Sequence, residues 1–201
     1  METFQTFSEA RGGQGLTIFD IDKTLFNTDT KVKIINKDGE VIKTLDKSSE
    51  AYKLKKGERY DFGDFKSAKA FAQGATPIGR MIKKAKAIIK NATKTGSRVI
   101  FVTARADMDD KKLFIDTFKK HGLDMSKVYV ERSGNLGIGD TARNKQTVFK
   151  KYLDSGKYSR VRVFDDWIGN LQALLVLRDK YPDIKFEAWL VGPTGRINTI
   201  K

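Results

Sequence analysis

The chain has 201 residues, the length of one domain, with 39 Lys and Arg against 25 Asp and Glu and a net charge of +14. It contains no cysteine, which excludes disulfides, thiolate catalysis and cysteine-ligated zinc. No apolar run approaches the roughly 20 residues of a membrane span, and the opening METFQTFSEARGGQG is too polar for a signal peptide, so we expect a cytoplasmic protein that does not contact a membrane.

Five short segments rich in β-branched and aromatic residues alternate with helical patterns, which predicts a mainly parallel five-stranded sheet flanked by helices. The strands are expected at residues 16–19, 98–102, 127–130, 160–164 and 185–191. Helices are expected at residues 77–95, 109–121, 144–155 and 168–180, where apolar residues recur every three or four positions. The pattern predicts an α/β fold in which residues 1–201 form a single domain.

Residues 27–76 interrupt this alternation, and we expect them to form a small cap or flap within the domain. The segment KVKIINKDGEVIKTL predicts a β-hairpin that turns at Lys37-Asp38-Gly39, because Asp-Gly supplies the positive φ angles of a tight turn. The polar stretch after it has no clear assignment. Its aromatic residues alternate with basic ones, so they could stack on the bases of a nucleic acid or pack inside the insert; they are Tyr52, Tyr60, Phe62 and Phe65.

The positive charge is concentrated in one part of the chain, because residues 25–100 contain 18 basic and 8 acidic residues. Such a surface attracts nucleic acids, nucleotides or other anionic partners by electrostatic steering and counterion release. A lysine-rich solvated surface without a partner is the alternative interpretation. Nothing in the sequence indicates an oligomeric state.

Carboxylates, hydroxyls and cations follow the predicted strands, at the edge where open parallel sheets bind their ligands. Like charges placed together at the edge of a core repel each other, so they require a cation, a proton or a polar ligand. Taken alone, each pair of Asp residues could instead belong to a turn or a helix cap. The residues of this set are Asp20, Asp22 and Thr24 after the first strand, Thr103 and Arg105 after the second, Asp165 and Asp166 after the fourth, and Lys145 at the start of a helix.

Four of these segments resemble the motifs of the haloacid dehalogenase (HAD) superfamily, in its branch of phosphatases with an aspartate nucleophile. FDIDKTLF resembles the first motif, VIFVTAR the second, Lys145 the third and VFDDWIGNL the fourth, in the order of the family. Lys23 stands where the family most often has glycine. More narrowly, RYD at residues 59–61, the arginine of VTAR, ERSGNLGIGDTARNK and the two Asp of VFDD are similar to polynucleotide 3′-phosphatase domains such as that of phage polynucleotide kinase.

The resemblance implies a Rossmann-like HAD core and a Mg²⁺-dependent phosphomonoester hydrolase that works through an aspartyl-phosphate intermediate. Asp20 would be the nucleophile, and Asp22 would give a proton to the leaving oxygen and later take one from water. Mg²⁺ would be bound by the carboxylates of Asp20 and Asp166 and by the backbone carbonyl of Asp22, with Asp165 behind them.

Other residues would contact the phosphate. Thr103 would donate a hydrogen bond to a phosphoryl oxygen, Lys145 would supply a fixed positive charge, and Arg105 would grip a phosphate with two donors. Arg105 could instead pair with the acidic run at residues 107–110. The remaining candidates for contacting the substrate or for orienting Lys145 are Thr24, Lys23, Arg143 and Asp140.

The basic insert and the likeness to 3′-phosphatases favour a nucleic acid 3′-phosphate or a nucleotide as the substrate. A phosphatase of a small soluble phosphate ester is one alternative. A catalytically silent nucleic-acid-binding protein with the same scaffold is another.

Three residues of types that often carry function are expected to be structural. His121 precedes Gly122 at the end of a predicted helix, where an imidazole is compatible with the helix dipole. Trp167 and Trp189 are expected to pack in or near the core.

Overall fold

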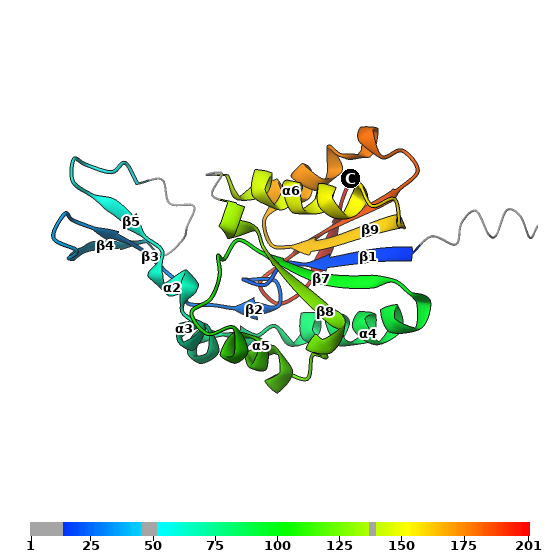
Figure 1. Cartoon of the computed structure of the whole chain (residues 1–201), viewed down its shortest axis with the longest axis horizontal. Coiled ribbons are helices and arrows are strands. Elements are labelled where there is room, and N and C mark those ends of the chain that lie inside the picture. Colours follow the sequence, from blue (N-terminus) through cyan, green and yellow to red (C-terminus); the bar gives the residue numbers. More distant parts are fainter. Residues whose placement is uncertain (1–13, 46–51, 137–139) are drawn as a thin grey trace, which may run out of the picture.

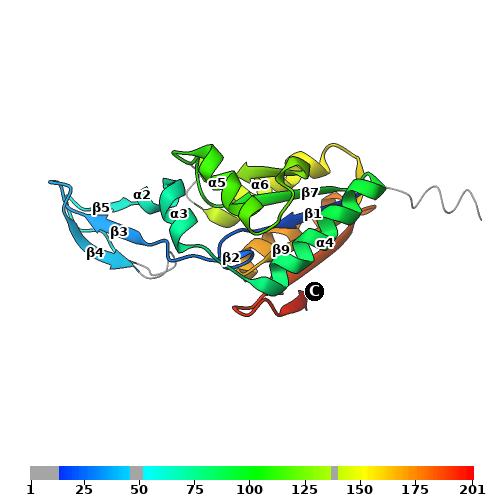
Figure 2. The ribbon, with the colours of Figure 1, turned by 90° about the horizontal axis from the view of Figure 1, so that it is seen from below.

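The computed structural model describes residues 14–45, 52–136 and 140–201. Figure 1 shows a central sheet with helices on both faces and a small arm of strands β3, β4 and β5 that extends beyond one end of the sheet. Figure 2, turned by 90°, shows the same arm extending from the body. Within the described residues, no helix is both long and apolar enough to cross a membrane.

The central sheet has six strands in the order β11-β10-β9-β1-β7-β8. Five of them are parallel, as predicted, and the sixth, β11, runs antiparallel to β10 at the edge. The prediction of five strands was therefore wrong by one. Strand β11 has only four residues, two of them polar, and it pairs with β10 where the chain turns back after Val191 and Gly192 N donates to Arg196 O at 2.8 Å. The strands are β1 (Gln14–Phe19), β7 (Arg98–Thr103), β8 (Val128–Arg132), β9 (Tyr158–Asp165), β10 (Lys185–Val191) and β11 (Ile197–Ile200).

Strand β1 occupies the point where the strand order reverses. After β1 the chain adds β7 and β8 on one side, and it then returns to place β9 and β10 on the other side. Open α/β sheets bind their ligands beside such a reversal, at the carboxyl ends of the strands. Asp20 directly follows β1 and Asp165 ends β9, so the topology places both carboxylates at this position.

Alternation along the strands divides the core between the two faces of the sheet. On β1, Phe19 packs in the cluster formed with α4 and α5, whereas Ile18 packs in the cluster formed with α6 and α7. The helices are α4 (Gly79–Thr95), α5 (Lys111–Lys120), α6 (Thr141–Leu153) and α7 (Ile168–Leu175).

All four predicted helices are present, with shifted ends. Helix α4 begins at Gly79 rather than at Pro77, because Pro77 pairs with Phe26 in a short ladder. Helix α6 begins before residue 144, because the Asp140 side chain caps it by accepting from Ala142 N at 2.9 Å. The last helix ends at Leu175, and a separate 3₁₀ turn, η3 (Arg178–Lys180), follows it.

The insert begins and ends in the two-stranded ladder of β2 (Phe26–Asn27) and β6 (Thr76–Pro77), in which Asn27 pairs with Thr76. The predicted hairpin is present, because β3 and β4 pair antiparallel around Gly39, whose φ is 85°. The stretch without an assignment supplies the third strand of this small sheet and two short helices. These elements are β3 (Val32–Ile35), β4 (Val41–Leu45), β5 (Arg59–Asp61), α2 (Gly63–Lys66) and α3 (Ala68–Gly74).

Two of the four aromatic residues that alternate with basic ones in the insert pack inside it, and two are exposed. Tyr52 and Phe65 pack against the small core of the three-stranded sheet, whereas Tyr60 and Phe62 are exposed. The insert is joined to the body by Phe71 of α3, whose ring centroid lies 4.9 Å from that of Phe114 on α5.

The expectation for the two tryptophans holds for one of them. Trp189 is half-buried and stacks on Phe164 at 6.2 Å between centroids. Trp167 is 47% exposed, so its expected place in the core was wrong. Trp167 directly precedes α7, and its backbone N donates to the Asp165 carboxylate at 2.9 Å.

His121 follows the last residue of α5, and its ring centroid lies 5.3 Å from that of Phe26.

Two glycines offer a matched test of the packing around the strand ends. A Cβ on Gly134 would lie 2.2 Å from Ala104 O and 2.7 Å from the backbone carbonyl carbon of Arg105, whereas a Cβ on Gly79 would meet nothing within 4 Å. We expect Gly134→Ala to lower the free energy of unfolding by about 2 kcal/mol or more, because backbone cannot yield as a side chain does. Gly79→Ala should leave it unchanged or raise it by about 0.5–1 kcal/mol. Urea unfolding measures both, and equal stabilities of the two variants would contradict the close approach at Gly134.

Candidate active site

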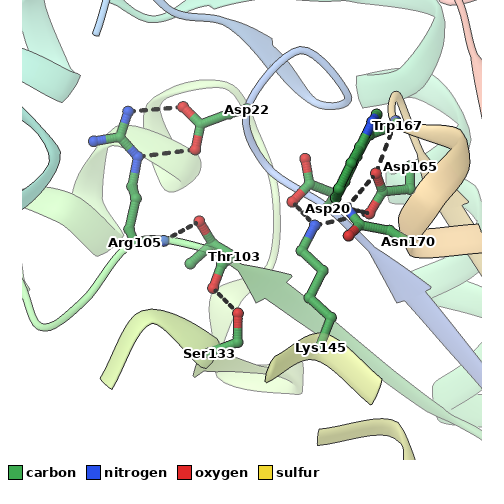
Figure 3. A network of polar contacts seen from close by, with 9 residues as sticks. All are labelled: Asp20, Asp22, Thr103, Arg105, Ser133, Lys145, Asp165, Trp167 and Asn170. Carbon is green, nitrogen blue, oxygen red and sulfur yellow. Dashed lines mark hydrogen bonds and ion pairs between the residues drawn. The ribbon is translucent and has the colours of Figure 1, made fainter. Parts of the chain in front are cut away.

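A buried ammonium group lies between two buried carboxylates at the carboxyl end of the sheet (Figure 3). Lys145 Nζ donates to Asp20 Oδ1 at 2.6 Å and to Asp165 Oδ2 at 2.7 Å, and each of the three side chains is at most 6% exposed. Burial opposes the charge on Lys145, but the carboxylates of Asp165 and Asp20 outweigh it and raise the pKa of Lys145. Lys145 is therefore a fixed positive charge at this position.

The carboxylate of Asp165 accepts hydrogen bonds from three residues. Besides Lys145, its carboxylate accepts from Trp167 N at 2.9 Å and from Asn170 Nδ2 at 2.8 and 2.9 Å. Asn170 was missing from the predicted site. Its position near the start of the helix that follows the two Asp residues, within VFDDWIGNL, is the signal that could have indicated it. Asp165 thus uses its oxygens within the protein and positions Lys145.

Asp166 completes an acidic triad with Asp20 and Asp165, because one carboxylate oxygen of each lies within 4.8 Å of the others. Burial raises the pKa of Asp20 well above its usual range; the charge of Lys145 opposes this increase, and the neighbouring carboxylates add to it. Burial and Asp165 raise the pKa of Asp166 to about 6. One ammonium does not balance three carboxylates, and carboxylate oxygens are the ligands that hard divalent cations prefer, so this triad could hold a metal ion.

The carboxylate of Asp22 points away from Lys145 and toward Arg105 (Figure 3). Arg105 donates to it twice, from Nε at 2.9 Å and from Nη2 at 2.7 Å, and Thr28 Oγ1 donates at 2.7 Å. The acidic triad, as found among the described residues, does not include the Asp22 carboxylate. The structure therefore separates Asp22 from Asp20, although only one residue lies between them.

Arg105 is 1% exposed, and most of its donors are already occupied. Apart from Asp22, it donates to Thr30 Oγ1 at 2.5 Å and to Phe65 O at 3.3 Å, so these bonds use four of its five N–H groups. Its guanidinium carbon also lies 5.3 and 5.0 Å from the ring centroids of Phe65 and Phe71. The two donors that were expected to bind a phosphate thus bind the carboxylate of Asp22 instead. Within the described residues, Arg105 does not pair with the acidic run at 107–110.

Two hydroxyl groups lie at the ends of the first two strands. Thr103 is completely buried; its Oγ1 accepts from Arg105 N at 3.1 Å, and its carbonyl accepts from Ser133 Oγ at 2.9 Å. Thr24 is also completely buried, and its Oγ1 finds no hydrogen-bond partner among the described residues. The hydroxyl group of Thr24 is therefore both unpaired and closed off from solvent among the described residues.

Lys23 adopts a left-handed backbone conformation, with a φ of 57°, as expected for a position that favours glycine. It lines a hollow of 350 Å³ together with Asp166, Thr28 and Pro193.

Arg143 does not orient Lys145, because in the described part of the chain its side chain takes no part in the hydrogen bonds of Lys145. Asp140 acts on Lys145 only by capping the helix that carries it.

No protein-family model matches this chain, and no curated protein matches it.

Removing one charge from the acidic triad should stabilise the metal-free protein. Because the pKa of Asp166 is raised from 3.8 to about 6 on folding, its ionisation opposes folding: the penalty is absent below about pH 4, grows up to pH 6 and is complete above it. We expect Asp166→Asn to raise the free energy of unfolding in EDTA by about 1–3 kcal/mol at pH 7.5 and by nothing at pH 4. Denaturant titrations at both pH values measure this.

Asp183→Asn is the control, because Asp183 is exposed and has no partner among the described residues. Mg²⁺ should then stabilise the wild type and Asp183→Asn more than Asp166→Asn. A gain for Asp166→Asn that is equal at pH 4 and pH 7.5 would contradict the crowding of the carboxylates.

The pair of Arg105 and Asp22 should be strongly coupled. Arg105→Ala leaves Asp22 without its two charged donors, and breaking a buried pair typically costs about 3–5 kcal/mol. Arg105→Lys should also destabilise, because an ammonium cannot replace two parallel donors. A double-mutant cycle with Asp22→Ala, followed by urea unfolding, measures the coupling, and Arg178→Ala, at an exposed arginine, is the control. Additive effects of the two substitutions would exclude the pairing.

Proposed function

We propose that this protein is a Mg²⁺-dependent phosphomonoester hydrolase that works through an aspartyl-phosphate intermediate, on a Rossmann-like HAD core with residues 27–76 as a cap. The observation that carries the proposal is the acidic triad of Asp20, Asp165 and Asp166 around the buried ammonium of Lys145, beside the reversal of strand order. The segments that resemble the first, third and fourth HAD motifs contribute the residues of this cluster.

Asp20 is the proposed nucleophile. Lys145 holds its Oδ1 at 2.6 Å, so the other carboxylate oxygen is left to attack phosphorus. A bond forms between that oxygen and phosphorus while the bond to the ester oxygen breaks, and water then hydrolyses the aspartyl phosphate to release inorganic phosphate. Mg²⁺, held by Asp20 and Asp166, would reduce the repulsion between the carboxylate and the phosphate dianion.

Asp22 is the proposed proton donor for the leaving oxygen. Its carboxylate is bound by Arg105 and Thr28, so it must give up part of this binding before it can take a proton and turn toward the ester. A phosphate presents two acceptor oxygens to a guanidinium, as a carboxylate does. When the substrate binds, oxygens of its phosphate would therefore replace the Asp22 carboxylate on Arg105. Arg105 would then bind the phosphate, and Asp22 would be free to donate a proton.

The hydroxyl groups and Lys23 would bind the substrate. The unpaired hydroxyl of Thr24 is completely buried, so it would donate to a phosphoryl oxygen only after a local movement uncovers it. Lys23 lines the hollow beside Asp166, where it would contact an anionic group next to the phosphate. The basic insert with its exposed Tyr60 and Phe62 favours a nucleic acid 3′-phosphate or a nucleotide as the substrate.

Replacing the nucleophile should abolish turnover without disturbing the fold. We expect Asp20→Asn to lower the rate of Mg²⁺-dependent phosphate release at least about 1000-fold, because an amide cannot attack phosphorus, while Asp183→Asn keeps the wild-type rate. The assay compares oligonucleotides carrying a 3′-phosphate, mononucleotides and sugar phosphates, and circular dichroism monitors folding. Full activity of Asp20→Asn would remove Asp20 as the nucleophile, and activity on sugar phosphates alone would contradict the nucleic acid substrate.

A further inference from the structure

A second and larger hollow lies at the opposite edge of the sheet from Asp20. Its volume is 680 Å³, and Gln14, Arg98 and Tyr158, which begin β1, β7 and β9, are among the residues that line it. Asp20 and Asp165 lie at the other ends of β1 and β9, so the two sites are separated by the length of the strands. We call this hollow the amino-edge groove.

Cations outnumber anions along the amino-edge groove. It is lined by Arg98, Lys127, Lys151 and Lys157, and Glu131 is the acidic residue among the described residues that line it. Glu131 already accepts from Lys151 Nζ and from the Tyr152 hydroxyl, both at 2.7 Å. Within the described residues, the side chains of the other three cations form no ion pair. Like charges held together in this way favour an anionic ligand.

The cations are spread across the sheet rather than gathered around one point. Arg98 begins β7, Lys127 precedes β8, and Lys157 precedes β9, which is separated from β7 by β1. Three intervals between neighbouring strands amount to about 15 Å. This spread exceeds the reach of one phosphate group and suits the repeated charges of a polyanion.

An aromatic ring is presented among these cations. Tyr129 lies on the edge strand β8 and is 60% exposed. Lys151 Nζ lies 6.0 Å from the centroid of its ring and 5.5 Å from the centroid of Tyr152. An exposed ring beside positive charges is the combination by which proteins bind single strands, because bases stack on the ring and phosphates pair with the cations.

We propose that the amino-edge groove binds single-stranded nucleic acid, with a base stacked on Tyr129 and phosphates at Arg98, Lys127 and Lys157. This binding requires neither a metal ion nor a terminal phosphate. It is therefore independent of the proposed hydrolysis at the other edge of the sheet.

The test is fluorescence anisotropy of a labelled oligothymidylate without terminal phosphates, in EDTA, over a series of salt concentrations. The triple variant Arg98→Gln, Lys127→Gln, Lys157→Gln should bind at least tenfold more weakly than the wild type at about 50 mM salt. The slope of log Kd against log salt should fall by about 2, because each phosphate contact to a single strand contributes about 0.7. Tyr129→Ala should weaken binding about fivefold to a hundredfold, whereas Tyr129→Phe should retain it.

The matched control carries the same loss of charge elsewhere. Lys83, Lys111 and Lys120 are exposed on α4 and α5, outside the insert and the groove, and their replacement by Gln should change the affinity less than threefold. Asp20→Asn should bind like the wild type, which separates this test from that of hydrolysis, and thermal melts of each variant monitor folding. Equal weakening of the groove and control variants, loss of binding in Asp20→Asn, or no binding by the wild type at low salt would each overturn the proposal.

Discussion

The crowding of negative charge at the ends of two neighbouring parallel strands is the constraint on which the candidate site depends. Asp20 and Asp165 lie beside each other because β1 pairs with β9, and burial makes their charges costly. Lys145 on α6 and Asn170 on α7 reduce this cost by donating to the carboxylates. The two helices that cover one face of the sheet thus also complete the polar cluster, while the excess of negative charge that remains is what makes a divalent cation a fitting ligand.

A second buried ion pair connects the insert to the body. Arg105 leaves the end of β7, holds Asp22 beyond the end of β1, and contacts Thr30 and Phe65 of the insert. Its guanidinium lies over two aromatic rings, so a change in the position of the insert alters the surroundings of this one side chain. In the proposed mechanism, the same side chain connects the binding of a phosphate to the release of the proton donor.

The two edges of the sheet differ in charge. The carboxyl edge presents the acidic triad, and the amino edge presents cations around an exposed tyrosine. A parallel sheet allows this division, because all its strands begin at one edge and end at the other. The net charge of +14 is therefore unevenly distributed, because acidic groups gather at one edge of the sheet and cations line the other.

The sequence by itself determined the five parallel strands, the four helices, the hairpin of the insert and the set of polar residues at the strand ends. These features are local, because side-chain periodicity and turn residues act over a few positions. Tertiary structure alone decided the distant partners of Arg105, namely Asp22, which lies 83 residues away, and Thr30, which lies 75 residues away. Such contacts depend on the path of the whole chain. For that reason two carboxylates that are neighbours in the sequence have different partners in the fold, with Asp20 bound to Lys145 and Asp22 bound to Arg105.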